Sequence, residues 1–371
     1  MDNIRYHEVQ PSNDQAAFKE FNSIDFELKA PGRKLLKNSI LVSFRPLVNS
    51  TGTTAVVKAN RIGLDNKIGY HGAFESFTTS GASGMIENVQ DYPRYAAMLA
   101  AGSLDDADLL NVRYQAEGRG VTLASGQYAV QKPKASNETA ALLQTMEYCV
   151  MPKIALNSMM GDDYSFDKNG SIKVSTVLAR NNNFLFGLDV DGNVNYSLTN
   201  VKLHFISVPD DGKQEPMMMN TVVSAKSAIT SDSANLSFKV PATSCSGVVM
   251  SFIKQDNENL NTKNSYALEK LPNIDSVQYM FNSSTSQGIS YAIEDQDELI
   301  RRGLKALGDA GHSQVSASKY AVNEGFLIGE GFSDVLDLSQ EKFSVQIKSQ
   351  CPEITTSARL VYLYFLNMIE I

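Results

Sequence analysis

Residues 343–348 read Phe-Ser-Val-Gln-Ile-Lys, so that apolar and polar side chains alternate without a break. Successive side chains of a β-strand point to opposite faces, and this period of two is typical of a strand with one face in the core and one in water. The same alternation recurs at residues 24–28, 40–45, 172–175 and 236–240. The chain is therefore predicted to be rich in half-buried strands.

The last apolar run, residues 358–365, carries large apolar side chains on both faces. Leu360, Tyr362 and Tyr364 alternate with a second apolar set at positions 361, 363 and 365. A strand with no polar face needs cover on each side. We expect this strand to lie at the centre of a packed structure.

Turn-forming residues separate the predicted strands. Asn-Gly and Asp-Gly pairs adopt positive φ at little cost and mark tight connections between strands. Such stretches occur at residues 49–52, 167–170, 191–193 and 210–212. Many short strands joined by tight turns favour an antiparallel sandwich over a parallel α/β sheet.

Only two helices are predicted. The first begins near Pro93, a residue suited to the first helical position, and runs to Gly102. The second covers about Glu294 to Leu307, with acidic side chains in its first turns, basic ones near its end, and Gly308 as the stop. Both helices are interpreted as insertions between strands.

Composition limits the class of protein. The 371 residues contain 33 basic and 41 acidic side chains, a formal net charge of −8, and 43% hydrophobic residues. This length suffices for two domains with their own cores, and the composition excludes a disordered chain. The acidic balance argues against direct binding to nucleic acid. Three scattered cysteines predict no disulfide framework, and the absence of a signal-like or membrane-spanning apolar run predicts synthesis in the cytoplasm as a soluble protein.

No catalytic, cofactor or metal site is predicted. The four histidines lack metal-ligand spacing, and His204 is interpreted as a solvent-facing or hydrogen-bonded sheet histidine. The glycine pairs at 118–120 and 329–331 are interpreted as turns or bulges because neither continues as a phosphate loop. Acidic groups at 105–108, 162–163, 189–191 and 210–211 lie in turn-like contexts and are interpreted as solvated turn residues.

Six segments occur in an order that resembles a known family. They are Gly84–Tyr92, Phe184–Leu188, Tyr196–Leu203, Ala234–Ser244, Gly247–Ile253 and Asp275–Asn282. Together they resemble the double jelly-roll major capsid proteins of tailless icosahedral viruses. The resemblance is closest to those of polinton-like viruses and virophages, with membrane-containing tailless phages further away.

The resemblance implies an all-β fold of two tandem eight-stranded antiparallel jelly rolls with short inserted helices. The expected divisions are an N-terminal arm at 1–22, a first jelly roll at 23–193 and a second at 194–371. Such proteins form homotrimeric capsomers with a pseudo-hexameric outline that tile an icosahedral shell. The implied partners are further copies of the chain, neighbouring capsomers, vertex (penton) and minor capsid proteins, with an internal viral membrane left open. The implied location is the virion, and no enzymatic activity is expected.

Four aromatic residues are candidates for subunit contacts: Phe74, Phe77, Tyr92 and Tyr95. Core packing is the alternative for each of them. The net acidic segment 1–22 is predicted to lie along the shell interior and to clamp neighbouring capsomers or a minor protein. Two other functions stay open, namely a vertex or minor capsid protein and a carbohydrate-binding or carbohydrate-cleaving β-sandwich.

Overall fold

The protein is described here by a computed structural model, which covers most of the chain. The described residues are 3–51, 63–65, 67–103, 116–119, 127–129, 142–143, 147–158, 162–186, 193–212, 216–281, 292–309, 326–340, 342–350 and 357–371. The chain folds into two compact units. The first comprises Met1–Ala96, Leu104–Met217 and Asn257–Tyr266, and the second Ala97–Ser103, Met218–Asp256 and Ala267–Ile371.

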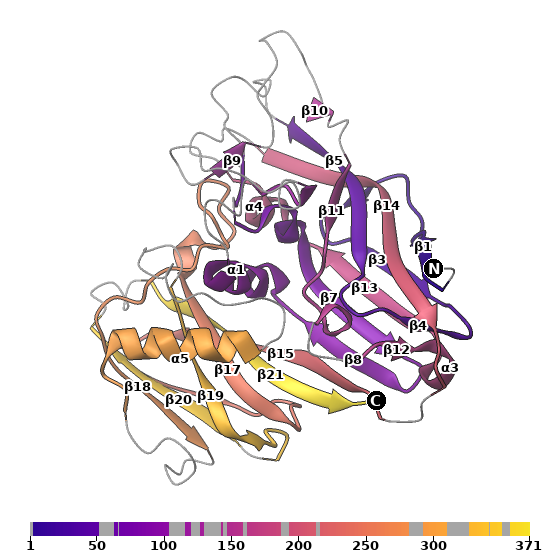
Figure 1. The fold of residues 1–371 in the computed structure, drawn as a ribbon. Helices are drawn as coiled ribbons and strands as arrows, with labels where there is room; N and C mark the ends of the chain where they lie inside the picture. The colour runs from indigo at the N-terminus through magenta and orange to yellow at the C-terminus, as the bar shows by residue number, and fades with distance from the viewer. Residues whose placement is uncertain are drawn as a thin grey trace. The chain divides into compact units, whose positions relative to one another are not determined.

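Strands dominate the first unit (Figure 1). They are β1 (Arg5–Val9), β2 (Phe18–Lys19), β3 (Ser23–Leu28), β4 (Arg33–Leu35), β5 (Leu41–Thr51), β6 (Gly63–Asp65), β7 (Phe74–Gly81), β8 (Gly84–Val89), β9 (Gln127–Ala129), β10 (Leu142–Leu143), β11 (Tyr148–Val150), β12 (Tyr164–Ser165), β13 (Ile172–Leu178) and β14 (Asn193–Pro209). The helical segments of this part of the chain are η1 (Gly69–Ala73), α1 (Tyr92–Ser103), η3 (Ala155–Asn157), α3 (Phe166–Asn169) and α4 (Asn181–Phe184).

The first unit has two antiparallel sheets. One has the order β10-β5-β14-β4-β12, with β1 and β2 also paired to β14 and β11 paired to β5. The other contains β8-β7-β13-β3. Strand β14 pairs with β5 from Asn193 opposite Thr51 to His204 opposite Leu41, with an irregularity between Thr199 and Lys202. This ladder joins segments about 150 residues apart, so it closes the unit.

The core of the first unit is aromatic. Phe44 of β5 contacts the edges of the Tyr70 and Phe74 rings at centroid distances of 5.3 and 5.7 Å. Phe74 and Phe77 pack at 5.3 Å, and Phe77 meets Tyr92 of α1 edge-on at 4.7 Å. Because β5 and β7 belong to different sheets, these contacts join the two faces of a sandwich.

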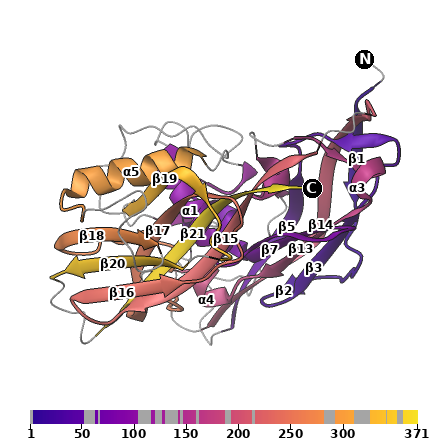
Figure 2. The same ribbon diagram turned by 90° about the horizontal axis from the view of Figure 1, so that it is seen from below.

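Two sheets also form the second unit. Its strands are β15 (Met218–Ile229), β16 (Ser233–Phe238), β17 (Cys245–Lys254), β18 (Ile274–Phe281), β19 (Leu327–Leu336), β20 (Phe343–Ser349) and β21 (Arg359–Glu370), together with η4 (Gln255–Asn257) and α5 (Gln296–Asp309). One sheet contains β19-β17-β21-β15, and the other has the order β16-β20-β18, whose strands lie side by side in Figure 2. The described part of this unit thus contains seven strands, against the eight expected.

Strand β21 confirms the prediction from its two-sided apolar pattern. Val361, Leu363 and Phe365 belong to the core of the second unit, and Tyr362 and Tyr364 on the opposite face are buried as well. Phe365 meets Phe343 of β20 edge-on at 5.3 Å, which links the two sheets. The neighbours β17 and β15 satisfy both edges of β21, and the face that carries Phe365 is covered by the sheet that contains β20.

Both predicted helices are confirmed as α1 and α5. Helix α5 lies against β19 and β17, and two glycines allow its close approach. A side chain at Gly303 would come within 2.8 Å of the Gly329 nitrogen, and one at Gly329 within 2.4 Å of the Val248 carbonyl oxygen. Among the residues that the structure describes, no helix is both long and apolar enough to span a membrane.

Three expectations from the sequence need correction. The boundary expected after residue 193 falls at the start of β14, which pairs throughout with strands of the first unit, and the division lies instead after Met217. Segment 1–22, expected as an N-terminal arm, contains β1 and β2, which both pair with β14. Residues 49–51 belong to β5 and not to a turn, whereas Gly170 and Gly212 have the positive φ expected of their turns.

Candidate functional site

Two histidines lie at the seam between β1 and β14. The Nδ1 atom of His204 is 2.7 Å from the Tyr6 hydroxyl, and its Nε2 atom is 2.8 Å from the Ser43 hydroxyl. His204 is therefore a hydrogen-bonded sheet histidine, as predicted. His7 Nε2 lies 2.7 Å from the Ser207 hydroxyl. His312 lies outside the described residues.

The sequence Ser43, His204, Tyr6 has the order of a nucleophile, a base and an orienting group. Ser43 is only 4% exposed, so a substrate carbonyl has no access to its hydroxyl. The three side chains cross β5, β14 and β1, and their hydrogen bonds tie these strands together. Their role is to hold the sheet.

A buried polar cluster surrounds His71. The Tyr92 hydroxyl accepts a hydrogen bond from the Lys153 backbone N–H at 3.0 Å and lies 2.6 Å from His71 Nδ1, to which it donates. His71 Nε2 lies 3.5 Å from Glu117 Oε2, which is 2.8 Å from Arg119 Nε. This cluster fastens the segment 116–119 onto η1 and α1.

The charges in this cluster are fixed by their surroundings. Burial lowers the pKa of His71 to about 4, so its ring is neutral at pH 7. Burial acts to raise the pKa of Glu117, but Arg119 and His71 outweigh it and hold this pKa at about 2. At neutral pH the ion pair is therefore Arg119 with Glu117. Both partners are nearly fully buried, so a substrate has no access to them. We assign the pair a structural role.

The glycine motifs behave as bends and close contacts. Gly118 has a φ of +72°, and a side chain there would collide with the Tyr70 ring, so the 118–120 motif is a turn where it is described. Gly329–Gly331 lies inside β19, next to an irregularity in the pairing of β19 with β17. Neither motif forms a phosphate cradle.

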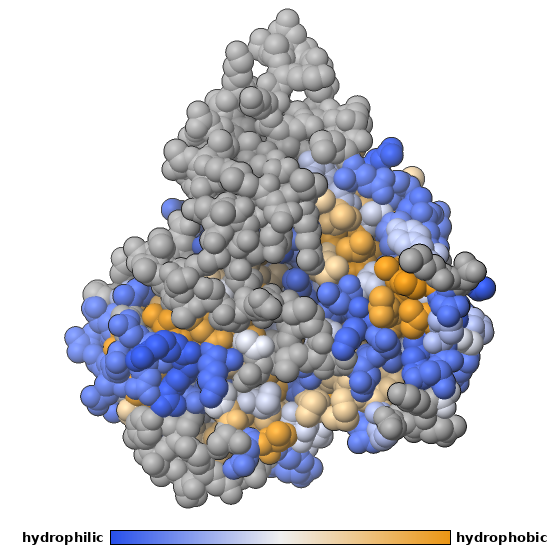
Figure 3. Space-filling view, in the orientation of Figure 1, coloured by the Kyte–Doolittle hydropathy of each residue, from blue (hydrophilic) through white to orange (hydrophobic). Residues whose placement is uncertain are grey.

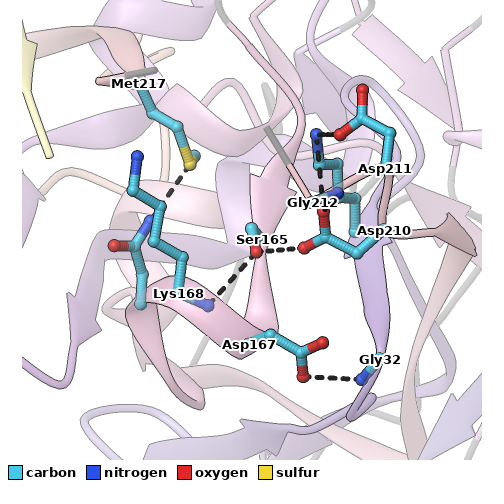
Figure 4. Close-up of polar contacts among 10 residues, drawn as sticks. Gly32, Ser165, Asp167, Lys168, Asp210, Asp211, Gly212 and Met217 are labelled. Atoms are coloured by element: carbon cyan, nitrogen blue, oxygen red, sulfur yellow. Dashed lines mark hydrogen bonds and ion pairs between the residues drawn. The ribbon is translucent and has the colours of Figure 1, made fainter. Parts of the chain in front are cut away.

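Acidic turn residues are paired with donors. In Figure 4, Asp210 accepts hydrogen bonds from the Ser165 hydroxyl and from the Gly212 N–H, the latter at 2.9 Å. Lys34 bridges Asp211 and Asp210, with a separation of 3.6 Å from Asp210. Burial acts to raise the pKa of Asp210, but these hydrogen bonds and Lys34 hold it below its ordinary value.

Two other acidic residues, Asp167 and Asp163, accept hydrogen bonds from backbone N–H groups. The Asp167 carboxylate accepts the Gly32 N–H at 2.6 Å, and Asp163 accepts the Lys37 N–H at 2.8 Å (Figure 4 shows the former). These carboxylates anchor chain reversals. The interpretation of 210–211 as solvated turn acids is wrong for Asp210, whose side chain is only 10% exposed and accepts hydrogen bonds within the chain. Residues 105–108 and 189–191 lie outside the described residues. The described part of the chain contains no group of three or more His, Cys, Asp or Glu side chains able to hold a metal ion.

The four aromatic candidates for subunit contacts lie in the interior. Phe74, Phe77, Tyr92 and Tyr95 are all buried within the chain. None of them has surface to offer a second subunit, so core packing, the alternative weighed for each, is what the structure places there. Their local sequence could not separate the two roles, because buried and exposed aromatic residues look alike in one strand or helix.

The N-terminal segment instead carries three exposed apolar side chains, two near β1 and one after β2. Ile4 is 65% exposed, Tyr6 64% and Phe21 58%. The backbone of Phe21 has a φ of +63°, uncommon for an aromatic residue, and the Arg180 guanidinium lies 5.4 Å from its ring centroid. Figure 3 shows hydrophobic surface near the place where Figure 1 draws β1. We define these three residues as the N-terminal surface.

Large exposed apolar residues elsewhere are more scattered along the chain. Among the described residues they are Met85, Leu260, Val335 and Met368. Three of the seven such residues therefore lie in the first 21 positions. In the sequence this segment stands out for its net charge, and no local signal marks its apolar residues as exposed.

Comparison with solved structures identifies the fold. The faustovirus major capsid protein has a TM-score of 0.60 at 8% identity, covering 99% of this chain and 90% of its own. A chain of the Sputnik virophage has a TM-score of 0.59 at 10% identity, covering 100% and 86%. The mavirus major capsid protein has a TM-score of 0.54 at 12% identity, covering 99% and 90%.

The chain therefore has the double jelly-roll fold of these viral proteins, as the sequence predicted. No protein-family model matches the sequence, and no curated protein matches it.

The buried ion pair gives a stability prediction. Arg119→Met leaves Glu117 buried without its cation, and removing one partner of such a pair costs about 3–5 kcal/mol. Urea unfolding of Arg119→Met should show this loss. Glu27→Gln, which breaks the exposed Lys29–Glu27 pair, is the control and should change stability by less than about 1 kcal/mol. Equal effects of the two substitutions would contradict the assigned role of Arg119.

Proposed function

We propose that this chain is a major capsid protein that assembles as a homotrimeric, pseudo-hexameric capsomer of an icosahedral viral shell. The observation that carries the proposal is the presence of two tandem jelly rolls over the full length of the chain, matching major capsid proteins over about nine tenths of their length. Three copies supply six similar sandwiches, which is the number needed for a near-hexagonal outline.

The contacts made by the polar side chains also agree with a structural role. The histidines and turn acids described above are engaged in structural contacts, which supports a role without catalysis. A net charge of −8 supports a shell that encloses its genome without gripping it directly. The virion is then the location of the assembled protein, with further capsomers, vertex proteins and minor capsid proteins as partners.

The alternatives fit less well. A vertex protein of the expected kind carries one jelly roll and forms pentamers, whereas this chain carries two. A carbohydrate-active sandwich needs an aromatic groove and paired free carboxylates. Only Tyr6 and Phe21 are large exposed aromatic residues among those described, and the Asp210 and Asp211 carboxylates both lie against Lys34.

Within the capsomer lattice, we propose that the N-terminal surface contacts neighbouring capsomers. Ile4, Tyr6 and Phe21 extend from a segment that is itself fixed to β14, so their positions are preset before contact. Preset apolar anchors bind with less loss of conformational entropy than residues of a free arm. Deleting the whole segment 1–22 would also remove the buried Phe18, so point substitutions test this role more cleanly.

Native mass spectrometry of the purified chain tests the capsomer. The expected species is a stable trimer at three times the chain mass of 40.6 kDa. A cyclic trimer has head-to-tail contacts, and an obligate interface of this kind buries more than about 2,000 Å². The trimer should therefore persist at nanomolar concentration. A pentamer would support the vertex protein instead, and a monomer that binds glycans would support the third class.

Substitutions in the N-terminal surface should impair assembly beyond the trimer without impairing trimer formation. The double variant Ile4→Ser, Phe21→Asn should still form trimers but should raise the concentration needed for larger assemblies at least about tenfold, as expected if anchors worth about 1.4 kcal/mol are lost. Light scattering against protein concentration measures this. Met85→Ser removes a side chain of matched exposure (66%) outside the segment and serves as the control. An equal loss in both variants would rule out a special role for the N-terminal surface.

A further inference from the structure

Strand β1 is attached to the sheet chiefly by polar contacts. It pairs with β14 from Arg5 opposite Ser207 to Val9 opposite Leu203. Three of its five residues are exposed and the other two are only half-buried. With so little apolar burial, its attachment depends on the backbone ladder and on the side-chain bonds along the seam.

The His7 ring shares a serine hydroxyl with the buried Arg33. The buried Arg33 donates from Nε to the Ser207 hydroxyl oxygen at 2.6 Å, and that oxygen also lies 2.7 Å from His7 Nε2. A neutral His7 ring can accept the Ser207 proton through an unprotonated Nε2, whereas a protonated ring would donate to the same oxygen that already accepts from the positively charged Arg33. The His7 ring also stacks on Phe205 at a centroid distance of 4.4 Å.

Protonation of His7 places a positive charge close to two arginines, Arg33 and Arg5. Burial lowers the pKa of His7, and Arg33 and Arg5 lower it further. The acidic residue of β1, Glu8, follows His7 on the strand and therefore points to the other face, where it pairs with Lys202 at 2.7 Å. Glu8 is thus turned away from the His7 ring. Arg33 also donates a hydrogen bond to the Asn3 carbonyl oxygen at 2.5 Å. Repulsion between a protonated His7 and Arg33 therefore weakens a contact that holds the residues just before β1.

His204, on the same seam, is built differently. Its pKa is also lowered, chiefly by burial, but Glu8 and Glu147 act against this shift, whereas the charged neighbours of His7 that shift its pKa are both cations. Its two ring nitrogens face the hydroxyls of Tyr6 and Ser43, and each hydroxyl oxygen can accept from a protonated ring. Its hydrogen bonds therefore survive protonation. His7 is the group whose charge state opposes the attachment of β1.

The chain just beyond β1 has its own anchor. The Ser12 N–H and hydroxyl both donate to the Asp25 carbonyl oxygen, at 2.7 and 2.9 Å. Asn13 donates to the Ser23 carbonyl oxygen at 2.8 Å and accepts from the Asp25 N–H at 3.0 Å. These bonds hold residues 12–13 on β3, so β1 can leave β14 while residues 12–13 and the strands after them stay in place.

We propose that β1 is an acid-released strand: protonation of His7 below about pH 6 frees residues 3–9 from the β14 edge at Leu203–Ser207 while the rest of the chain stays folded. The sign follows from the released state, in which His7 regains its ordinary pKa of about 6.5. Attachment is at full strength above that pH and weakens as the pH falls below it. Release needs no partner and no assembly, so its test is independent of the proposed function.

Hydrogen–deuterium exchange of the full-length chain at pH 7.5, 6.5 and 5.5 tests this, with rates corrected for the intrinsic pH dependence. Protection of the Arg5–Val9 amides should fall by up to about tenfold per pH unit below 6.5, the limit for one linked proton. Peptides from β13 and β21 should keep their protection. His7→Gln, which can still accept from Ser207 but does not titrate, should keep β1 protected at pH 5.5.

Two further variants complete the design. His7→Lys should lose β1 protection already at pH 7.5, and His204→Gln, the matched control, should retain the pH dependence of the unmodified chain. The proposal is overturned if β1 protection is unchanged between pH 7.5 and 5.5, if His7→Gln loses as much as the unmodified chain, or if β13 and β21 lose protection together with β1.

Discussion

The first unit depends on the antiparallel ladder between β14 and β5. Ten paired positions join segments about 150 residues apart, and forming such a distant pairing carries a large loop-closure cost that must be regained by burial. The aromatic contacts from Phe44 on β5 to Tyr70 and Phe74 provide that burial. Once β14 is in place, its remaining edges receive β1, β2 and β4.

The position of β14 also explains the division of the chain. A jelly roll is complete only when its last strand returns to the sheet in which it began, so the division cannot precede β14. The turn acids that follow β14, Asp210 and Asp211, fasten the chain to Lys34 and Ser165 of the same unit. The strands of the second unit accordingly all follow this anchor, from Met218 onward.

Local pattern predicted the strands well and their partners poorly. Alternation located β3, β13 and β20, and the two-sided apolar run located β21, because side-chain period reports burial directly. The prediction that Tyr196–Leu203 belongs to the second domain is wrong, since no local signal states which sheet a strand joins. Residues 5–9 include Arg5, His7 and Glu8 and resemble a loop, so β1 is found only through its partner β14. The hydroxyl of the buried Tyr92 bonds to His71 and to the Lys153 backbone. Neither partner lies within residues 84–95, so the local sequence could not predict the burial of Tyr92.

Reactive side chains in this protein are used to join elements. Ser43, His204 and Tyr6 cross three strands, and Arg119 with Glu117 fixes a segment beneath the core. Function is therefore expected at surfaces, and two of the exposed N-terminal residues, Ile4 and Tyr6, belong to the segment 3–9 whose attachment we propose to depend on pH. The N-terminal segment thus carries both the proposed contacts between capsomers and the proposed pH-dependent strand.

Electron cryo-microscopy of assemblies formed by the purified chain tests the central claim most directly. The account predicts rings of six jelly-roll densities contributed by three chains, repeated on a hexagonal lattice, with both units of every chain in the same ring. Rings of five, or particles in which the two units of one chain do not share a ring, would contradict it.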